Sequence, residues 1–93
     1  MKIRKEVLWF TRQMERKLRE NEWKGNWSKC EPQYLLDRIE QEVNELDGSI
    51  LEDGNKDDIK NTVEETADVA NFAMMIADNT AKKRWNKKEV GHG

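Results

Sequence analysis

The sequence is a short, highly charged chain of 93 residues, enough for one small domain but not for two. Charged residues make up 39% of it, mean hydropathy is −1.08, and Leu, Ile, Val and Phe together number only 18. These values exclude a large self-contained core, whereas the net charge of −2 is too small for the high-charge signature of disorder. We therefore expect a thin-cored helical protein that completes its core by self-association.

The chain contains one cysteine, Cys30, and one histidine, His92. These counts exclude Cys/His zinc sites, Ser-His-Asp triads and Cys-His nucleophile pairs, so a bound metal must be held by oxygen. A lone cysteine cannot form an internal disulfide, which suits a reducing compartment. No segment resembles a secretory signal or a membrane span, and we predict a cytoplasmic protein without a membrane partner.

Charge is distributed unevenly along the chain. Residues 1–30 carry nine basic and four acidic side chains, residues 31–68 carry three and thirteen, and residues 80–93 carry five and one. An acidic centre between basic ends suits a divalent cation with bound phosphates. Solvated helix faces that differ in sign by chance are an equally good explanation of the charge alone.

Apolar spacing predicts three helices and no strand. The first runs from about residue 3 to 22, because apolar side chains recur there at steps of three and four: Val7, Phe10, Met14 and Leu18. The second begins near Pro32, with Ser28 and Glu31 as a capping box, and ends near Gly48.

A third helix is predicted from Asn55, its N-cap, to about Thr80. From residue 66 to 77 it is apolar on nearly every side, which is typical of a buried helix. The chain thus divides into a helical domain, residues 1–80, and a basic tail or short helix, residues 81–93. The predicted fold class is an all-α bundle of three main helices with a short C-terminal segment.

Two pairs of acids, each with i, i+3 spacing, lie beside the apolar stripes of consecutive helices. Glu42 and Glu45 border the stripe of the second helix, and Glu65 and Asp68 interrupt the apolar third helix. A buried carboxylate needs a proton, a basic partner or a cation, and four carboxylates from facing helices suit a hard cation. We predict a Mg²⁺ site at these four residues. Such pairs also arise by chance in an acid-rich chain, and that alternative stays open.

The same residues carry a family resemblance. Glu42–Leu46 and Glu64–Val69 resemble the paired Glu-x-x-Glu and Glu-x-x-Asp signatures of the MazG-like all-α nucleoside triphosphate pyrophosphohydrolases. Lys24–Trp27 and Asp68–Ile76 resemble the small single-domain members of that family, and the likeness covers about residues 7 to 80. One departure is Gln41, where many relatives have a second Glu, and it leaves the number of metal ions open.

The resemblance implies an activity and a set of site residues. It implies a homodimer or homotetramer that holds Mg²⁺, with Mn²⁺ as a substitute, at Glu42, Glu45, Glu65 and Asp68. It implies hydrolysis of nucleoside triphosphates between the α and β phosphates to a monophosphate and pyrophosphate, which clears unwanted nucleotides. Water is the nucleophile, because no histidine or cysteine is suited to attack, and Glu42 or Glu45 is the expected base.

Substrate contacts are predicted from three further residues. Lys24 lies on a glycine-containing loop and is the leading phosphate ligand, with Arg38, Lys60 and the basic tail as weaker choices. Trp27 is a candidate for stacking on the base, and Asn71, one turn beyond Asp68, for bonding the base or sugar. Each has a structural alternative: a solvated lysine, a tryptophan that closes the bundle end, and an asparagine bonded to a neighbouring helix.

Two other functions remain open. The chain could be a non-catalytic helical adaptor whose basic first helix and tail contact a protein or nucleic acid, although nucleic acid is not the partner we expect. It could instead belong with the phosphoribosyl-ATP pyrophosphohydrolases, which share the fold and the bond cleaved. The base and sugar preferred are not predicted.

Overall fold

The computed structural model describes residues 1–22, 26–50 and 56–85, with the side chain of Lys56 left aside. Within these residues the protein is all-α, with three helices, one 3-10 turn and no strand, as predicted. The elements in chain order are α1 (Lys5–Glu20), η1 (Asn26–Lys29), α2 (Pro32–Ile50) and α3 (Lys56–Ala81). None of the helices in this part of the chain combines the length and the apolar character that crossing a bilayer requires.

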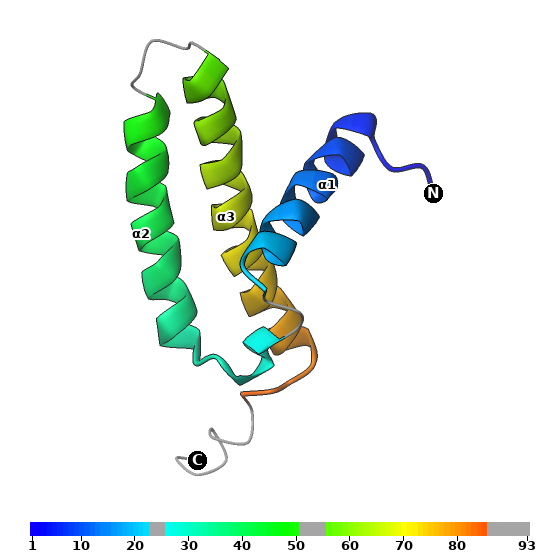
Figure 1. Cartoon of the computed structure of the whole chain (residues 1–93). Helices are drawn as coiled ribbons and strands as arrows, with labels where there is room; N and C mark the ends of the chain where they lie inside the picture. Colours follow the sequence, from blue (N-terminus) through cyan, green and yellow to red (C-terminus); the bar gives the residue numbers. More distant parts are fainter. Residues whose placement is uncertain (23–25, 51–55, 86–93) are drawn as a thin grey trace.

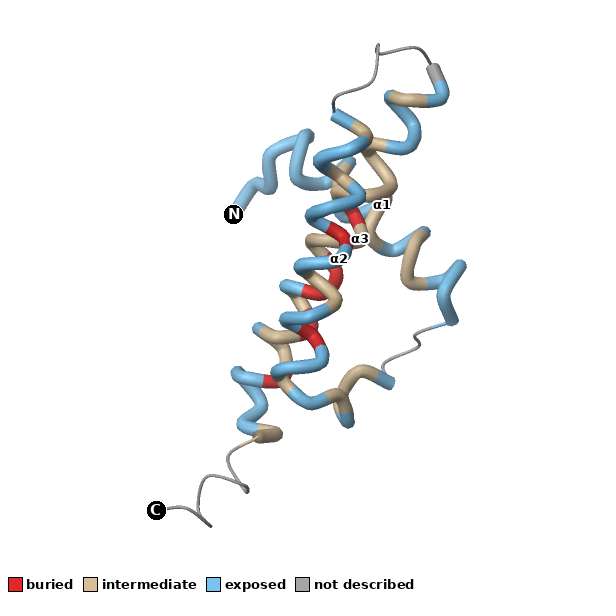
Figure 2. The backbone as a smooth tube through the Cα atoms, turned by 90° about the vertical axis from the view of Figure 1, so that its left-hand side faces the viewer, coloured by how far each residue is buried: buried red, intermediate tan, exposed pale blue. Residues whose placement is uncertain are grey.

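The body of the molecule is the pair α2 and α3, which lie side by side and antiparallel (Figure 1). Leu35 from α2 packs with Phe72 and Met75 from α3, and Leu35 and Met75 are fully buried. The buried residues follow the line where the two helices meet (Figure 2). Each such side chain contributes about 1.5–3 kcal/mol through burial, so a core with so few of them is thin, in agreement with the composition.

Helix α1 packs against α3 and does not reach α2 (Figure 1). Its C-terminal half lies on α3, and its N-terminal half diverges from the pair. Among its residues none is buried. The attachment is polar as well as apolar: the Asn71 amide donates to the Met14 carbonyl at 3.0 Å, and Arg16 lies 3.9 Å from Glu64.

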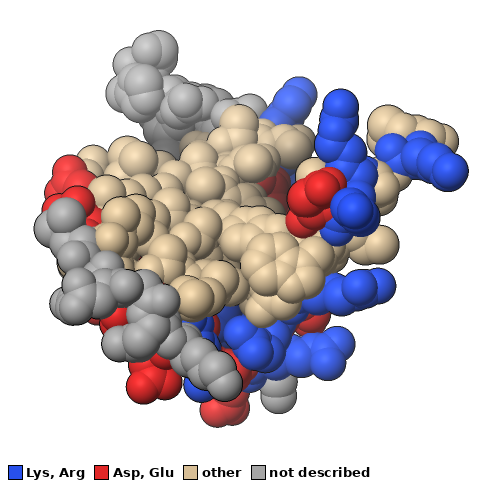
Figure 3. All heavy atoms as spheres, turned by 90° about the horizontal axis from the view of Figure 1, so that it is seen from above, with Lys and Arg blue, Asp and Glu red and all other residues tan. Residues whose placement is uncertain are grey.

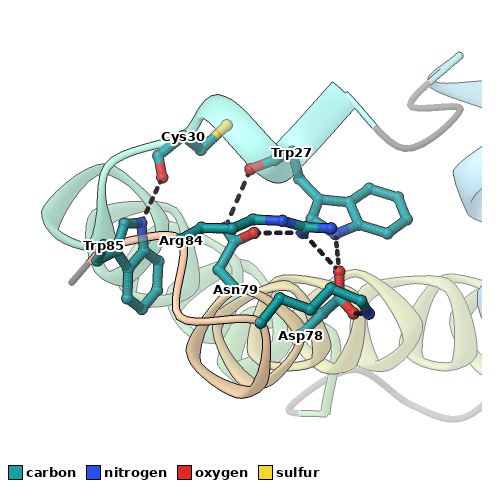
Figure 4. Close-up of polar contacts among 7 residues, drawn as sticks. Trp27, Cys30, Asp78, Asn79, Arg84 and Trp85 are labelled. Atoms are coloured by element: carbon teal, nitrogen blue, oxygen red, sulfur yellow. Dashed lines mark hydrogen bonds and ion pairs between the residues drawn. The ribbon is translucent and has the colours of Figure 1, made fainter. Parts of the chain in front are cut away.

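The end of α3 and the turn η1 are joined by a hydrogen-bond network (Figure 4). The Trp27 indole donates to Asp78 at 3.0 Å, and the Asn79 amide donates to the Trp27 carbonyl at 3.0 Å. Arg84 bonds both Asp78 and Asn79, at 2.8 and 2.7 Å. We call this network the C-terminal clasp; its members are Trp27, Cys30, Asp78, Asn79, Arg84 and Trp85.

The rest of the clasp draws the start of the predicted tail onto the body. The Trp85 indole donates to the Cys30 carbonyl at 3.0 Å, and Lys82 pairs with Asp78. Hydrogen bonds from Lys82, Trp27 and Arg84 hold the pKa of Asp78 well below its ordinary value. Residues 82–85 form a turn, and residues 86–93 lie outside the described part of the chain.

The end of α2 predicted near Gly48 lies two residues from the observed end at Ile50. One predicted boundary, the N-cap of α2, is wrong. Ser28 is not the N-cap of α2, because it lies inside η1 and Glu31 directly precedes the helix. Pro32 is the first residue of α2, where its missing N–H costs nothing. The predicted cap Asn55 lies outside the described residues.

Helix α3 ends in a Schellman turn built on a residue other than glycine. Lys83 has φ 54°, its N–H donates to the Thr80 carbonyl at 3.0 Å, and the Arg84 N–H donates to the Asn79 carbonyl at 3.0 Å. This left-handed residue turns the chain back toward η1 and so brings Arg84 and Trp85 into the clasp.

Candidate functional site

A pocket of about 700 Å³ is lined by side chains from all three helices. Its wall is mostly polar and charged: Lys17 comes from α1, Asn21 is the residue that caps the C-terminal end of α1, Arg38 comes from α2, and Asp68 and Phe72 come from α3. The pocket exists because the apolar core is narrow, so polar side chains one turn away from it remain within reach of solvent.

Three of the predicted metal ligands meet in this pocket. Carboxylate oxygens of Glu42, Glu45 and Glu65 all lie within 4.8 Å of one another; we call these residues the carboxylate triad. The i, i+3 spacing puts Glu42 and Glu45 on one face of α2, opposite Glu65 on α3. Glu42 is buried, Glu65 is half-buried and Glu45 is exposed. The triad therefore reaches from the helix interface to the solvent.

Electrostatics indicate that the triad needs a positive partner. The pKa of Glu42 is raised to about 8, first by burial, then by hydrogen bonds with Glu65 and Glu45 and by the charges of Glu45 and Asp68. Hydrogen bonds between carboxyl groups require a shared proton. A hard cation that replaces this proton would find three oxygen donors already gathered, so the residues fit an ion such as Mg²⁺ or Mn²⁺.

The fourth predicted ligand, Asp68, lies in the same pocket but not in the triad. Its carboxylate is 3.8 Å from the Lys17 ammonium. Burial raises the pKa of Asp68, Lys17 opposes this, and the charges of Glu65 and Glu45 add to the increase. Asp68 thus stands beside the triad with a lysine as its partner, and its role as a metal ligand stays a prediction.

Two cationic side chains, Lys17 and Arg38, line the same pocket as these acids. Burial lowers the pKa of Lys17, but the charges of Asp68, Glu20 and Glu64 outweigh burial, so the pKa lies above its ordinary value. Lys17 therefore stays positively charged. It was not among the residues singled out from the sequence, although its place one turn after Met14, on the inward face of α1, is a signal that could have indicated it.

Arg38 is the second cation. Its guanidinium is 3.1 Å from the Glu42 carboxylate, donates to Gln41, and lies 5.2 Å from the centre of the Phe72 ring. The ring and the glutamate fix the guanidinium at the wall of the pocket. The sequence indicated Arg38 only as a weak phosphate ligand, whereas the structure puts it directly beside the triad.

The structure does not bring the predicted substrate residues into this wall. Lys24 lies outside the described residues. Trp27 belongs to the C-terminal clasp and packs against the core, as in the alternative that it closes the bundle end. Asn71 is buried and bonded to α1, as in its own alternative, although its Oδ1 has no donor among the described residues.

Comparisons with known proteins assign no family. No family model matches the chain, and neither the curated proteins nor the solved structures include a match. In the residues that the structure describes, the protein is a small all-α protein of three helices with a carboxylate triad that could hold a metal ion.

Proposed function

We propose that the protein is a Mg²⁺-dependent nucleoside triphosphate pyrophosphohydrolase, the activity implied by its MazG-like motifs. The observation that carries the proposal is the convergence of three carboxylates: oxygens of Glu42, Glu45 and Glu65 lie within 4.8 Å of one another. The same pocket is lined by two cationic side chains, Lys17 and Arg38. Acids alone would repel a polyphosphate. A divalent ion at the triad, together with Lys17 and Arg38, would balance the four acids that line the pocket and so remove the repulsion of a triphosphate.

The proposed roles follow from burial and charge. Glu42 and Glu65 hold the cation from the helix interface, and the bound ion supplies charge neutralisation and acidifies water. Arg38 exchanges its partner Glu42 for phosphate oxygens once Glu42 holds the cation, and the Lys17 ammonium adds a second positive charge at the pocket wall. Of the two predicted bases, Glu45 is the better suited, because it is the exposed member of the triad and faces the solvent that supplies the water.

The reaction needs one proton acceptor and no covalent intermediate. The oxygen of water forms a bond to phosphorus while the bond from that phosphorus to the α–β bridging oxygen breaks. Glu45 takes the proton of the attacking water, and the bridging oxygen leaves with its electron pair. The products are a nucleoside monophosphate and pyrophosphate, and the expected role is removal of unwanted nucleotides from the pool.

A nucleotide panel tests the proposal. The protein is incubated with common and modified ribo- and deoxyribonucleoside triphosphates and with phosphoribosyl-ATP, with and without MgCl₂, and monophosphate and pyrophosphate are quantified. We expect equal amounts of both products, only with metal. Release of orthophosphate would contradict the bond assignment, and no product from any compound would favour the adaptor alternative.

Neighbouring glutamates on α3 provide a matched pair of variants. Glu65→Gln removes a member of the triad and should lower kcat by at least about 100-fold. Glu64→Gln changes the adjacent acid, which pairs with Arg16 and does not line the pocket, and should leave kcat within about twofold. Equal losses in the two variants would show that the triad has no special part in turnover.

A further inference from the structure

One wall of the pocket is a row of side chains along a single face of α2. Tyr34, Arg38 and Glu42 line the pocket at steps of four residues, and Glu45 follows at a step of three. Such steps keep side chains on one face of a helix. At a rise of about 1.5 Å per residue, Tyr34 stands about 12 Å along the helix axis from Glu42, with Arg38 midway between them. The row therefore has two ends, with Tyr34 at one and the carboxylate triad at the other.

The triad end of the row is the charged end. Asp68, one turn after Glu65 on α3, lines the same pocket and lies 3.8 Å from the Lys17 ammonium. Figure 3 shows further basic side chains gathered on the side of the molecule where α1 lies in Figure 1. The metal ion and the phosphates of a triphosphate therefore belong at this end. In a nucleotide the sugar separates the base from the phosphates, so a residue that receives the base has to lie away from the metal.

Tyr34 meets this requirement. It is 47% exposed, so part of its ring is open to a ligand. The other aromatic side chain in the described part of the wall, Phe72, is buried and has the Arg38 guanidinium over its ring, 5.2 Å from the centre. The ring that the sequence analysis chose for the base, Trp27, belongs to the C-terminal clasp and not to this wall. Tyr34 is thus the aromatic side chain of the wall that a base can reach.

We propose that the Tyr34 ring stacks on the base of the bound nucleotide, and that this contact makes the enzyme accept purine and pyrimidine triphosphates alike. Stacking tolerates every base, because each base has a flat π face. The remaining uncharged polar side chains of the described wall, Asn21 and Gln41, are amides with both donors and acceptors, so they favour no particular base edge. The inference rests on the proposed function and names the class of base that the same site takes.

Kinetics with and without a base test the assignment. Tyr34→Ala should raise KM for each of the four common deoxynucleoside triphosphates at least about 10-fold and leave kcat within about threefold, because the ring lies away from the reacting phosphates. Tyr34→Phe keeps the ring and should restore KM to within about twofold of the wild type. Ribose 5-triphosphate has the same α–β bond but no base, so its KM should be the same for the wild type and Tyr34→Ala.

An exposed ring elsewhere provides the control. Trp9 on α1 is 49% exposed and does not line the pocket, so Trp9→Ala should leave KM for every nucleotide unchanged. For the wild type, the KM values of the four nucleotides should agree within about 10-fold. A wider spread would overturn the inferred breadth, and an increase in KM that Tyr34→Phe does not reverse would overturn the stacking.

A binding measurement separates this inference from the proposed activity. Nucleoside triphosphates with a methylene group in place of the α–β bridging oxygen are not cleaved there, and calorimetric titration with Mg²⁺ present measures their binding. Turnover with a KM that Tyr34→Ala leaves unchanged would overturn the stacking and keep the activity. Binding that Tyr34→Ala weakens at least about 10-fold, without turnover of any nucleotide, would support the base site and contradict the activity. Absence of both binding and turnover would overturn both proposals.

Discussion

Glu42 is a buried carboxyl group held against two others, an arrangement that a folded chain adopts only with a proton or a cation to share. Its native pKa is about 8, whereas its ordinary value is 4.5. The metal-free protein at neutral pH therefore keeps a proton at the helix interface. A proton and a metal ion compete for the same carboxyl group, so metal binding depends on pH.

Stability should therefore fall as pH rises. The native state binds the Glu42 proton more tightly than the unfolded chain, so its contribution is complete below the unfolded pKa of 4.5 and is lost as pH rises through about 8. In the presence of a chelator, we expect the free energy of unfolding to decrease by ~1–3 kcal/mol between about pH 5 and pH 9. Urea denaturation at a series of pH values measures it.

The controls for this prediction separate Glu42 from the general charge of the chain. Glu42→Gln keeps a neutral group at the interface and should remove most of the pH dependence. Glu15→Gln, in an exposed pair with Arg19, should leave it unchanged. Mg²⁺ should stabilise the wild type at about pH 8 more than at about pH 5, because protons compete for the triad. A slope that survives in Glu42→Gln would contradict the assignment.

At the scale of elements, the end of α3 holds strain that substitution can relieve. Lys83 is exposed and has φ 54°, a conformation that costs a residue with a Cβ about 1 kcal/mol. Lys83→Gly should raise the free energy of unfolding by ~0.5–1 kcal/mol, as measured by thermal or urea denaturation. Lys82→Gly, at the position before the left-handed residue, is the comparison and should give no such increase.

The C-terminal clasp depends on Asn79, which is fully buried and serves both as donor to the Trp27 carbonyl and as acceptor from Arg84. Asn79→Ala removes both bonds and should destabilise the protein by ~2 kcal/mol in urea denaturation. Asn61→Ala, at an exposed position of the same helix, should change stability by less than about 0.5 kcal/mol. Similar effects of the two substitutions would show that the clasp contributes little.

The helices themselves could be predicted from the sequence, because apolar periodicity is a local property. The residues at which the helices begin and end were harder to predict. A glycine usually weakens a helix, yet Gly48 lies inside α2, which continues to Ile50. Helix α3 is followed by Lys83 in a left-handed conformation, and a lysine side chain gives no signal from which that conformation could be predicted. Which apolar positions of α2 face α3 and which face outward is decided by packing between helices, not by spacing.

At the scale of the whole molecule, the candidate site could be predicted in part. The i, i+3 pairs identify which acids share a helical face, and the structure brings Glu42, Glu45 and Glu65 together. The place of Asp68 beside Lys17 depends on how α1 crosses α3, which no local pattern determines. The place of Trp27 could not be predicted either, because its indole donates to Asp78, 51 positions along the chain.

Every contact between elements in the described part of the chain involves α3, which follows α1, η1 and α2 in the sequence. Until it has been synthesised, α1, η1 and α2 have nothing to pack against, and the clasp is complete only after Trp85. The nascent polypeptide therefore cannot acquire its tertiary structure in steps as it emerges. The three earlier elements can pack only once α3 is available, and the clasp forms only once Trp85 is available as well.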